Sequence, residues 1–292
     1  MVHLITILYQ SEAGISAFLD SLQAQDMPEW RLHAIDNATP DGSADLVAER
    51  ADPRITLHRN AANLGFAKAA NQGLREAAAA GGEFLVLINN DTAFEPDFLR
   101  HLVGVRAEHG AGVIAPRIMR RDQPDAAWYA GGHLAHGWVF ENRHEICPDA
   151  NPDPVTVDFA PGCCLGIARS VLEQVGLFDE SFFVYWEDTD FCLRLKQQGI
   201  PILYVPEPNL EHDGGAASGG EFSPAYIRLY FRSYMQVLRK HFGFQHALVT
   251  MLRLLSREIG RSSRDSRKVR AMANAMLHGL AAPMVAEARL GI

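Results

Sequence analysis

The stretch Phe84-Leu85-Val86-Leu87-Ile88-Asn89-Asn90-Asp91-Thr92 decides the fold class of this chain. A short unbroken apolar run is typical of a buried strand in a sheet that helices cover. The run ends abruptly in two amides and a carboxylate. The sequence therefore predicts a buried strand whose carboxyl end carries Asn89, Asn90 and Asp91.

The chain before this strand repeats the same plan. Three more apolar runs are predicted as strands, at Leu4 to Tyr9, Leu32 to Ile35 and Ile55 to Leu57. The segments between them place apolar residues at helical spacing, at Ala13 to Ala24, Ser43 to Arg50 and Ala67 to Ala80. Alternating strands and helices indicate an α/β fold, a mainly parallel doubly wound sheet with helices on both faces.

The chain after this strand is less regular. We expect hairpins beyond Pro116, a helix over Asp188 to Gln198, a strand over Ile202 to Val205 and a flexible loop at Gly214 to Gly220. The remainder has helical periodicity to its end. We therefore predict two parts, a nucleotide-binding domain over residues 1–218 and a C-terminal helical region over residues 219–292.

Composition excludes several classes of protein. With 292 residues, 48% of them hydrophobic, the chain can bury a full core, so disorder is not expected. A net charge of −8 without a long basic cluster in the first two-thirds argues against a nucleic-acid platform. The four cysteines lack the spacing of a zinc module and are expected to be buried thiols. The apolar start is too short for a signal peptide or membrane span, so we expect a cytoplasmic protein.

Polar residues follow each predicted strand of the first half. They are Tyr9, Gln10, Ser11 and Glu12 after the first, Asp36 and Asn37 after the second, Asn60 and Asn63 after the third, and Asn89, Asn90 and Asp91 after the fourth. Ligands of parallel sheets bind at this carboxyl edge. The carboxylate of Asp91 is placed to hold Mg²⁺ or Mn²⁺ against a phosphate group. An Asp in this place also serves as a simple turn former.

A second acidic motif opens the predicted helix near residue 188. Acidic residues at a helix start are usually caps, but Trp186-Glu187-Asp188-Thr189-Asp190 holds more acids than capping requires. Asp190 and Arg194 are four residues apart and are expected to pair on one helical face. That pairing leaves Asp188 as the candidate general base.

His212 lies between the predicted strand and the glycine-rich loop. Imidazole binds Mn²⁺ better than Mg²⁺, which favours manganese if this side chain is a metal ligand. A single histidine in a loop is more often merely solvated.

At these residues the chain resembles glycosyltransferase family 2, the inverting enzymes with the GT-A fold, and within it the rhamnosyltransferase-like branch of bacteria. The resemblance covers about residues 4 to 240. It rests on an ordered set of motifs: Asp36-Asn37, Asn63 to Gly73, Asn89-Asn90-Asp91, Pro161 to Gly166, Gly176 to Glu180, Trp186 to Asp190, and His212.

The resemblance implies a transfer of sugar from a dTDP- or UDP-linked donor to a hydroxyl of a glycan or lipid-linked acceptor. It implies that Asp188 is the catalytic base and that Asp91 and His212 bind Mn²⁺ or Mg²⁺. The residues expected around the donor are Tyr9, Glu12, Asp36, Asn63, Gly65, Lys68, Asn71, Asn89 and Asn90. Those expected to contact the acceptor or support the base are Trp186, Glu187, Asp190 and Arg194. Asn89 replaces the first acid of the family's DxD motif, and an amide binds a cation more weakly than a carboxylate does.

Two other classes of function are open at this point. A nucleotidyltransferase would also bind a metal at such a sheet, but it is expected to carry a basic glycine-rich loop that this chain lacks. A non-catalytic sugar-nucleotide binding module is the other alternative, against which Asp91, Asp188 and His212 together argue.

The basic segment Arg253 to Arg270 has two interpretations. Its mixture of Arg and Leu is typical of a helix that rests on an anionic membrane on the inner face of the cell. The other interpretation is a solvated helix face or an interface of a homo-oligomer.

Overall fold

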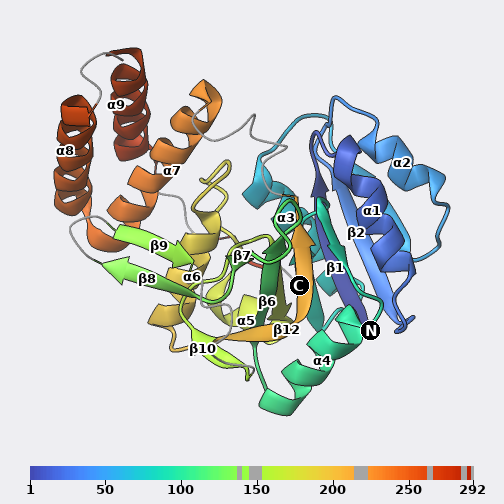
Figure 1. Ribbon diagram of the computed structural model, residues 1–292. Helices are drawn as coiled ribbons and strands as arrows, with labels where there is room; N and C mark the ends of the chain where they lie inside the picture. The colour runs from blue at the N-terminus through green and yellow to red at the C-terminus, as the bar shows by residue number, and fades with distance from the viewer. Residues whose placement is uncertain (137–139, 145–152, 214–222, 262–265, 284–287, 291–292) are drawn as a thin grey trace.

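A mixed sheet runs through the centre of the molecule (Figure 1). The structure is a computed structural model that describes residues 1–136, 140–144, 153–213, 223–261, 266–283 and 288–290. Within these residues the sheet has ten strands, with the main path β10-β12-β6-β11-β4-β1-β2-β3, β5 beside β12 and β7 beside β6. The strands β8 and β9 form a separate two-stranded antiparallel sheet.

The strands have the following bounds: β1 Val2–Leu8, β2 Trp30–Asp36, β3 Ile55–Arg59, β4 Phe84–Ile88, β5 Thr92–Phe94, β6 Val113–Arg120, β7 Ala127–Tyr129, β8 Gly132–His136, β9 Phe140–His144, β10 Val155–Val157, β11 Cys164–Ala168 and β12 Ile202–His212. The strands β1 to β4 are parallel to their neighbours in this set, whereas β11 is antiparallel to both β4 and β6. The prediction of a mainly parallel α/β sheet is therefore confirmed.

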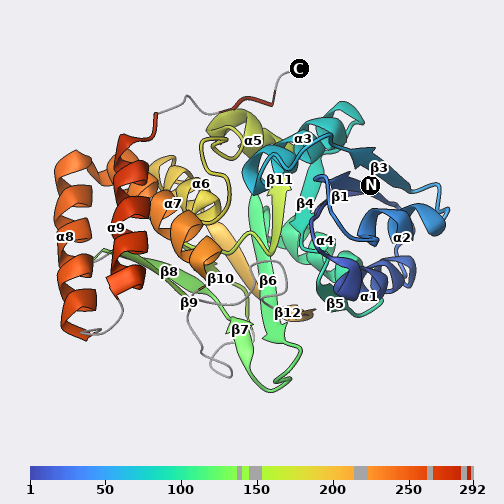
Figure 2. The ribbon, with the colours of Figure 1, turned by 90° about the horizontal axis from the view of Figure 1, so that it is seen from above.

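Helices cover both faces of this sheet. Their bounds are α1 Glu12–Gln23, α2 Ser43–Glu49, α3 Phe66–Ala79, α4 Phe98–His109, α5 Arg169–Val175, α6 Glu187–Gln197, α7 Pro224–Phe242, α8 Phe244–Arg261 and α9 Ser266–Ala281. Figure 2 shows α3 and α5 on one side of the central strands and α1 and α4 on the other. The change of side follows from right-handed crossovers, because the chain runs outward from β1 to β3 and then returns to β4.

The last strand is longer than the sequence pattern indicates. Pro206 and Pro208 lack the backbone N–H of a strand residue, and pairing with β6 is interrupted between Val205 and Leu210. Pairing then resumes and continues to His212, which also faces Thr92 of β5. The expectation that His212 lies in a loop is therefore wrong. The predicted loop Gly214 to Gly220 lies outside the described residues.

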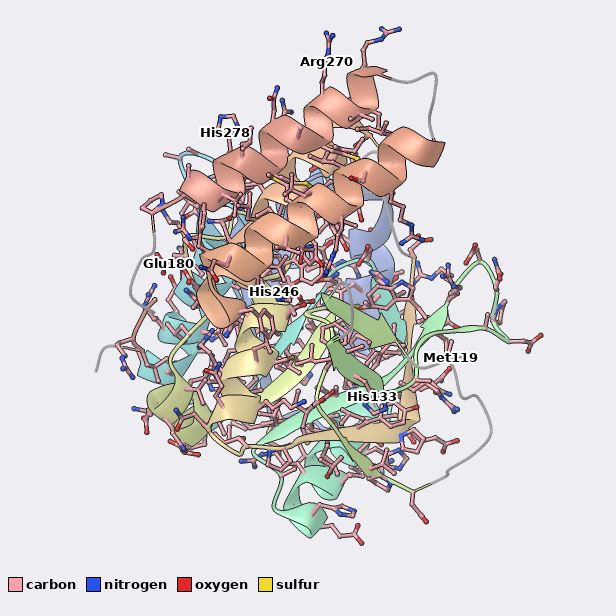
Figure 3. All side chains as sticks on the ribbon, turned by 90° about the vertical axis from the view of Figure 1, so that its left-hand side faces the viewer. Met119, His133, Glu180, His246, Arg270 and His278 are labelled. Carbon is pink, nitrogen blue, oxygen red and sulfur yellow. The ribbon has the colours of Figure 1, made fainter. Side chains whose placement is uncertain are left out.

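The three C-terminal helices pack against one another and, through α7, against α6. In Figure 3, α8 and α9 lie side by side, and Arg270 of α9 points away from the body of the molecule. The predicted boundary at residue 219 falls outside the described residues, and side chains of both parts share one hydrophobic cluster. In the part of the chain that the structure describes, no helix is long and apolar enough to cross a membrane.

Candidate active site

The carboxyl ends of β1, β2 and β4 meet the start of β11 at one edge of the sheet. Because β11 is antiparallel to β4, Cys164 pairs with Ile88, and the loop before β11 lies at this edge. Two successive residues of the loop bond to different parts of the site. The N–H of Gly162 donates to Asp188 Oδ2 at 3.1 Å, and the carbonyl of Cys163 accepts from the N–H of Asn89 at 2.8 Å. The loop thereby joins the start of α6 to the end of β4.

Asp91 and His212 come from distant parts of the chain and form a close pair. Asp91 Oδ1 lies 3.2 Å from His212 Nε2, and the two side chains are 21% and 8% exposed. Antiparallel pairing of β5 with β12 causes this approach, and the ring of Trp128 packs against the imidazole with centroids 4.9 Å apart. Asp91 Oδ1 is buried and makes no hydrogen bond with any described residue. The pair therefore presents an oxygen and a nitrogen with the spacing of two ligands of one ion.

The amides beside Asp91 connect the neighbouring strands. The side chain of Asn90 is buried and donates to the carbonyl of Ile7 in β1 at 2.5 Å. The carbonyl of Asn89 accepts from the Thr92 hydroxyl at 2.7 Å, while its half-buried side chain lies at the edge. Asn90 is thus engaged in holding β4 to β1, and Asn89 is the better placed of the two for a ligand.

Asp36 and Asn37 end β2 and organise the loop before α3. Asp36 is buried, and its Oδ1 accepts from the N–H of Thr39 at 2.9 Å. The side chain of Asn37 donates to Asn63 Oδ1 at 2.9 Å and accepts from the N–H of Leu64 at 2.9 Å. Asn63 Oδ1 also accepts from the N–H of Gly65. The predicted residues Asp36, Asn63 and Gly65 are therefore brought together, with Asn37 between them.

Gly65 is required by its backbone and by its neighbour. Its φ is +84°, and a Cβ at this position would lie 2.5 Å from the carbonyl oxygen of Phe183. The same carbonyl accepts from the N–H of Phe66 at 2.6 Å. This contact places the start of α3 against the loop that leads to Trp186. Lys68 follows on the first turn of α3 with an exposed side chain.

Asn71 is buried on α3, and both ends of its amide are engaged by the protein. It donates to the carbonyl of Phe178 at 2.8 Å and to Glu180 Oε1 at 3.0 Å, and it accepts from the N–H of Phe178 at 3.0 Å. Asn71 therefore holds the turn after α5, and its expected contact with the donor stays a prediction.

Tyr9 and Glu12 lie at the end of β1 and the start of α1. The N–H of Tyr9 donates to Ser11 Oγ at 3.0 Å. Glu12 exchanges hydrogen bonds with the start of α2, since its N–H donates to Asp41 Oδ2 and its Oε2 accepts from the N–H of Gly42. The Glu12 carboxylate is therefore tied to α2 at the rim of the site, whereas Tyr9 lies at the edge itself.

The candidate base Asp188 is half-buried and held in place at both oxygens. Besides the bond from Gly162, its Oδ1 accepts from the N–H of Thr189 at 2.6 Å. The neighbouring Glu187 is buried, and burial, followed by the charge of Asp188, raises the pKa of Glu187 to about 8. Glu187 is therefore protonated at neutral pH, so Asp188 is the residue of this pair that carries the negative charge.

Trp186 closes one wall of the site with an aromatic cluster. Its ring packs against Tyr234 and Tyr230 of α7, with centroids 4.5 and 5.3 Å apart. Trp186 and the preceding Tyr185 have φ of +70° and +67°. Left-handed backbone at two successive non-glycine residues costs about 1 to 3 kcal/mol each and persists only where packing enforces it. The cluster therefore fixes the direction from which α6 begins.

Asp190 and Arg194 pair as predicted, but far from solvent. Asp190 Oδ2 accepts from Arg194 Nε at 2.9 Å, and its Oδ1 lies 2.8 Å from both Lys240 and His241 of α7. Burial alone raises the pKa of Asp190, but the bond with His241 and the charges of Arg194 and Lys240 outweigh it and hold the pKa well below its usual range. Arg194 also donates to the carbonyls of Val175 and Leu177. These two residues are therefore structural supports of α6.

Two residues of the site, Asn37 and Gly162, belong to motifs noted in the sequence but were not assigned a role there. Asn37 directly follows the second strand, and its position after a strand was the available signal. Gly162 acts through its backbone N–H, which no side-chain pattern reveals.

Comparison with known proteins identifies the class to which this fold and site belong. The family model described as "Glycosyl transferase family 2" matches residues 4–176. The chain is 29% identical, over 83% of its length and 86% of the relative's, to an N-acetylglucosaminyl-diphospho-decaprenol L-rhamnosyltransferase of Mycobacterium tuberculosis. It is 24% identical to the dTDP-rhamnosyl transferase RfbF of Shigella flexneri, over 74% of this chain and 70% of the relative.

Among solved structures, the mannosyltransferase PcManGT of Pyrobaculum calidifontis, in complex with GDP-Man and Mn²⁺, superposes with a TM-score of 0.56 at 16% identity, covering 96% of this chain and 85% of its own. The protein is a glycosyltransferase with the GT-A fold. The chain belongs to glycosyltransferase family 2, and the two relatives described above are named as rhamnosyl transferases.

Proposed function

We propose that this enzyme transfers a sugar, L-rhamnose from dTDP-rhamnose, to a hydroxyl of a lipid-linked glycan acceptor by a single displacement with inversion. One observation carries the proposal. The loop before β11 bonds at Gly162 to the base Asp188 and at Cys163 to Asn89, two residues before Asp91. Because this loop contacts both segments, Asp188 and the pair of Asp91 and His212 lie at the same edge of the sheet, which supports a proton acceptor and a cation site there.

The proposed chemistry places the acceptor hydroxyl against Asp188. Its proton passes to the carboxylate, the acceptor oxygen bonds to the anomeric carbon, and the bond from that carbon to the diphosphate breaks with its electrons leaving on the diphosphate. The N–H groups of Gly162 and Thr189 hold the carboxylate in a fixed orientation. Protonated Glu187 adds no second charge beside it.

The residues of the edge fit a divalent cation. Asp91 supplies a buried oxygen that has no hydrogen bond to a described residue, and His212 supplies a nitrogen 3.2 Å from it. Bound there, Mn²⁺ or Mg²⁺ neutralises charge on the departing diphosphate. An imidazole ligand favours Mn²⁺.

The donor assignment draws on the relatives and on the nucleoside end of the site. Asp36 at the end of β2 offers a carboxylate for the imide N–H of thymine or uracil. The name of one relative specifies L-rhamnosyl transfer, and the name of another specifies dTDP-rhamnosyl transfer. A UDP-hexose is the alternative donor, because uracil presents the same imide.

The acceptor proposal includes contact with an anionic membrane through α8. Phe244, Leu252 and Ile259 are 54%, 54% and 58% exposed and recur at intervals that place them on one side of the helix. The side chains of Arg253 and Arg257 are exposed beside them. Sedimentation with vesicles of anionic lipid, compared with neutral lipid, tests this part. Binding that Leu252→Ser does not weaken would contradict it.

The function itself is tested by thermal shift with dTDP, UDP, GDP and CDP, each with and without Mn²⁺, followed by transfer from dTDP-rhamnose to a diphospho-lipid sugar. A ligand that binds only the folded chain raises its melting temperature. We expect a Mn²⁺-dependent shift with dTDP and a product of inverted anomeric configuration.

A shift in melting temperature with UDP alone would indicate a UDP-hexose as the donor. Retention of the anomeric configuration in the product would exclude the single-displacement mechanism. No shift with any nucleotide would overturn the proposed function.

A further inference from the structure

A second group of metal-ligand side chains lies beneath α3, away from the pair Asp91 and His212. His33 of β2, His58 of β3 and Glu76 of α3 bring one ligand atom each to within 4.8 Å of one another. His33 and His58 lie on diagonally related positions, since His33 faces Thr56 and Ile35 faces His58 in the parallel pairing of β2 with β3. The glycosyl-transfer chemistry uses none of the three.

Each of the three side chains also has one buried atom without a hydrogen bond to any described residue. These atoms are His33 Nδ1, His58 Nε2 and Glu76 Oε2. His58 Nε2 and Glu76 Oε2 lie 2.6 Å apart, but the contact lacks hydrogen-bond geometry. An ion pair of His58 with Glu76 also leaves the third atom unexplained, because His33 is only 6% exposed. Burying a polar atom without a hydrogen bond costs free energy, and one bound ion would satisfy all three of these atoms.

The surroundings orient two of these atoms. His33 Nε2 lies 3.1 Å from His3 Nδ1, and the two rings stack with centroids 5.4 Å apart. The tautomer in which Nε2–H donates to His3 leaves a lone pair on Nδ1 that faces the group. Glu76 Oε1 accepts from Gln72 at 3.4 Å, which leaves Oε2 for the group. Metal-bound histidines and carboxylates are commonly held by such outer hydrogen bonds.

We propose that His33, His58 and Glu76 form a zinc site that fastens α3 to β2 and β3. Two imidazoles and one carboxylate are a donor set that Zn²⁺ takes at about 2.0 to 2.2 Å, with a fourth position for water. His58 and Glu76 are 28% and 30% exposed, so both side chains have room to adjust around an ion. Burial, followed by the charges of His3 and His58, lowers the pKa of His33 to about 4, which keeps its ring neutral for binding.

The site has a structural consequence for the enzyme. Glu76 lies on the same helix whose first turn follows Gly65 and carries Lys68. Zinc would therefore stabilise the helix that follows the loop of Asn63 to Gly65, without contact with donor or acceptor.

The test uses the full chain without a histidine tag, stripped with EDTA and then titrated with Zn²⁺. Zinc content after gel filtration, melting temperature, and the visible absorption of bound Co²⁺ are measured. We expect one zinc per chain, a rise in melting temperature, and affinity at least tenfold weaker in both Glu76→Gln and His58→Gln.

Two variants serve as controls. His101→Gln alters another histidine near an acid, Asp97 at 3.4 Å, and should bind zinc as the unaltered chain does. Asp91→Asn should also keep the zinc while losing the Mn²⁺-dependent shift with nucleotide, which separates this site from the proposed function. Circular dichroism of the metal-free variants checks that each is folded.

Failure of the metal-free chain to retain zinc at micromolar concentration would overturn the proposal. If Glu76→Gln and His58→Gln bound zinc as tightly as the unaltered chain does, the proposal would be overturned as well, because the metal would then lie elsewhere.

Discussion

The carboxyl edge of the sheet and the interface between α6 and α7 use acids from one short motif for opposite purposes. Asp188 lies at the edge, half-buried, and receives hydrogen bonds from backbone N–H groups. Asp190 lies two residues later in the interface, has no exposed surface, and is surrounded by Arg194, Lys240 and His241. The first can accept a proton from a ligand, whereas the second is committed to its cationic neighbours.

The difference shows that the position of the candidate base Asp188 depends on the neighbouring interface between α6 and α7. A helix that begins with several acids at its positive end gains about 0.3 to 1 kcal/mol from each. That gain does not determine which acid faces solvent. The cationic side chains of α7 do, because they bind Asp190 and thereby turn Asp188 toward the edge.

The largest effect is expected from Asp188→Asn, which removes the candidate base at the carboxyl edge and leaves the interface between α6 and α7 unaltered. A positioned general base contributes about 10²- to 10⁴-fold to rate, so transfer should fall by that factor. The melting temperature and the binding of nucleotide with Mn²⁺ should stay nearly unchanged, as isothermal titration would show. Equal loss of nucleotide binding would instead place Asp188 in the donor site.

The next largest effect is expected from Asp190→Asn, which removes the buried carboxylate from the interface between α6 and α7. It removes the shared counter-ion of the buried Arg194 and the half-buried Lys240, which keeps its ion pair with Asp179. Loss of one partner of a buried pair costs about 3 to 5 kcal/mol. Urea unfolding measures this loss in the free energy of unfolding. Asp26→Asn is the matched control, because its ion pair with Arg100 is exposed and should contribute less than about 1 kcal/mol. Equal costs would refute the contrast between the two environments.

Glu187→Gln sharpens the comparison through pH. The pKa of Glu187 is raised from 4.5 to about 8, so the folded chain binds a proton that the unfolded chain releases. The stability due to the protonated form is therefore complete below pH 4.5 and is lost as pH rises toward 8. The variant, which cannot ionise, should gain melting temperature relative to the unaltered chain between pH 5 and 8. Parallel curves over that range would contradict the assignment.

The smallest effect concerns the loop at the edge. Gly65→Ala introduces a Cβ 2.5 Å from the Phe183 carbonyl at a φ of +84°, whereas Gly81→Ala meets the same φ with no neighbour within 4 Å. The strained backbone should lower the free energy of unfolding of both variants by about 1 kcal/mol. The contact with Phe183 should raise this loss in Gly65→Ala to as much as about 3 kcal/mol and should weaken nucleotide binding. Similar values for both would show that the contact with Phe183 is unimportant.

The parallel half of the fold could be predicted because its signals are local. Each strand from β1 to β4 is an apolar run followed by polar residues, and each helix repeats its apolar positions every three to four residues. The extension of β12 to His212 could not, since Pro206 and Pro208 interrupt the pattern and only pairing with β5 and β6 restores the strand.

By itself, the sequence determined the α/β class, the edge where ligands bind, and the resemblance that names Asp91, Asp188 and His212, because residue type and chain order suffice for these. The tertiary structure alone decided that Asn71 holds a turn, that Asp190 is a buried support, that Gly162 fixes the base, and that His33, His58 and Glu76 converge. These facts depend on burial and on contacts between distant segments, which composition and spacing along the chain do not contain.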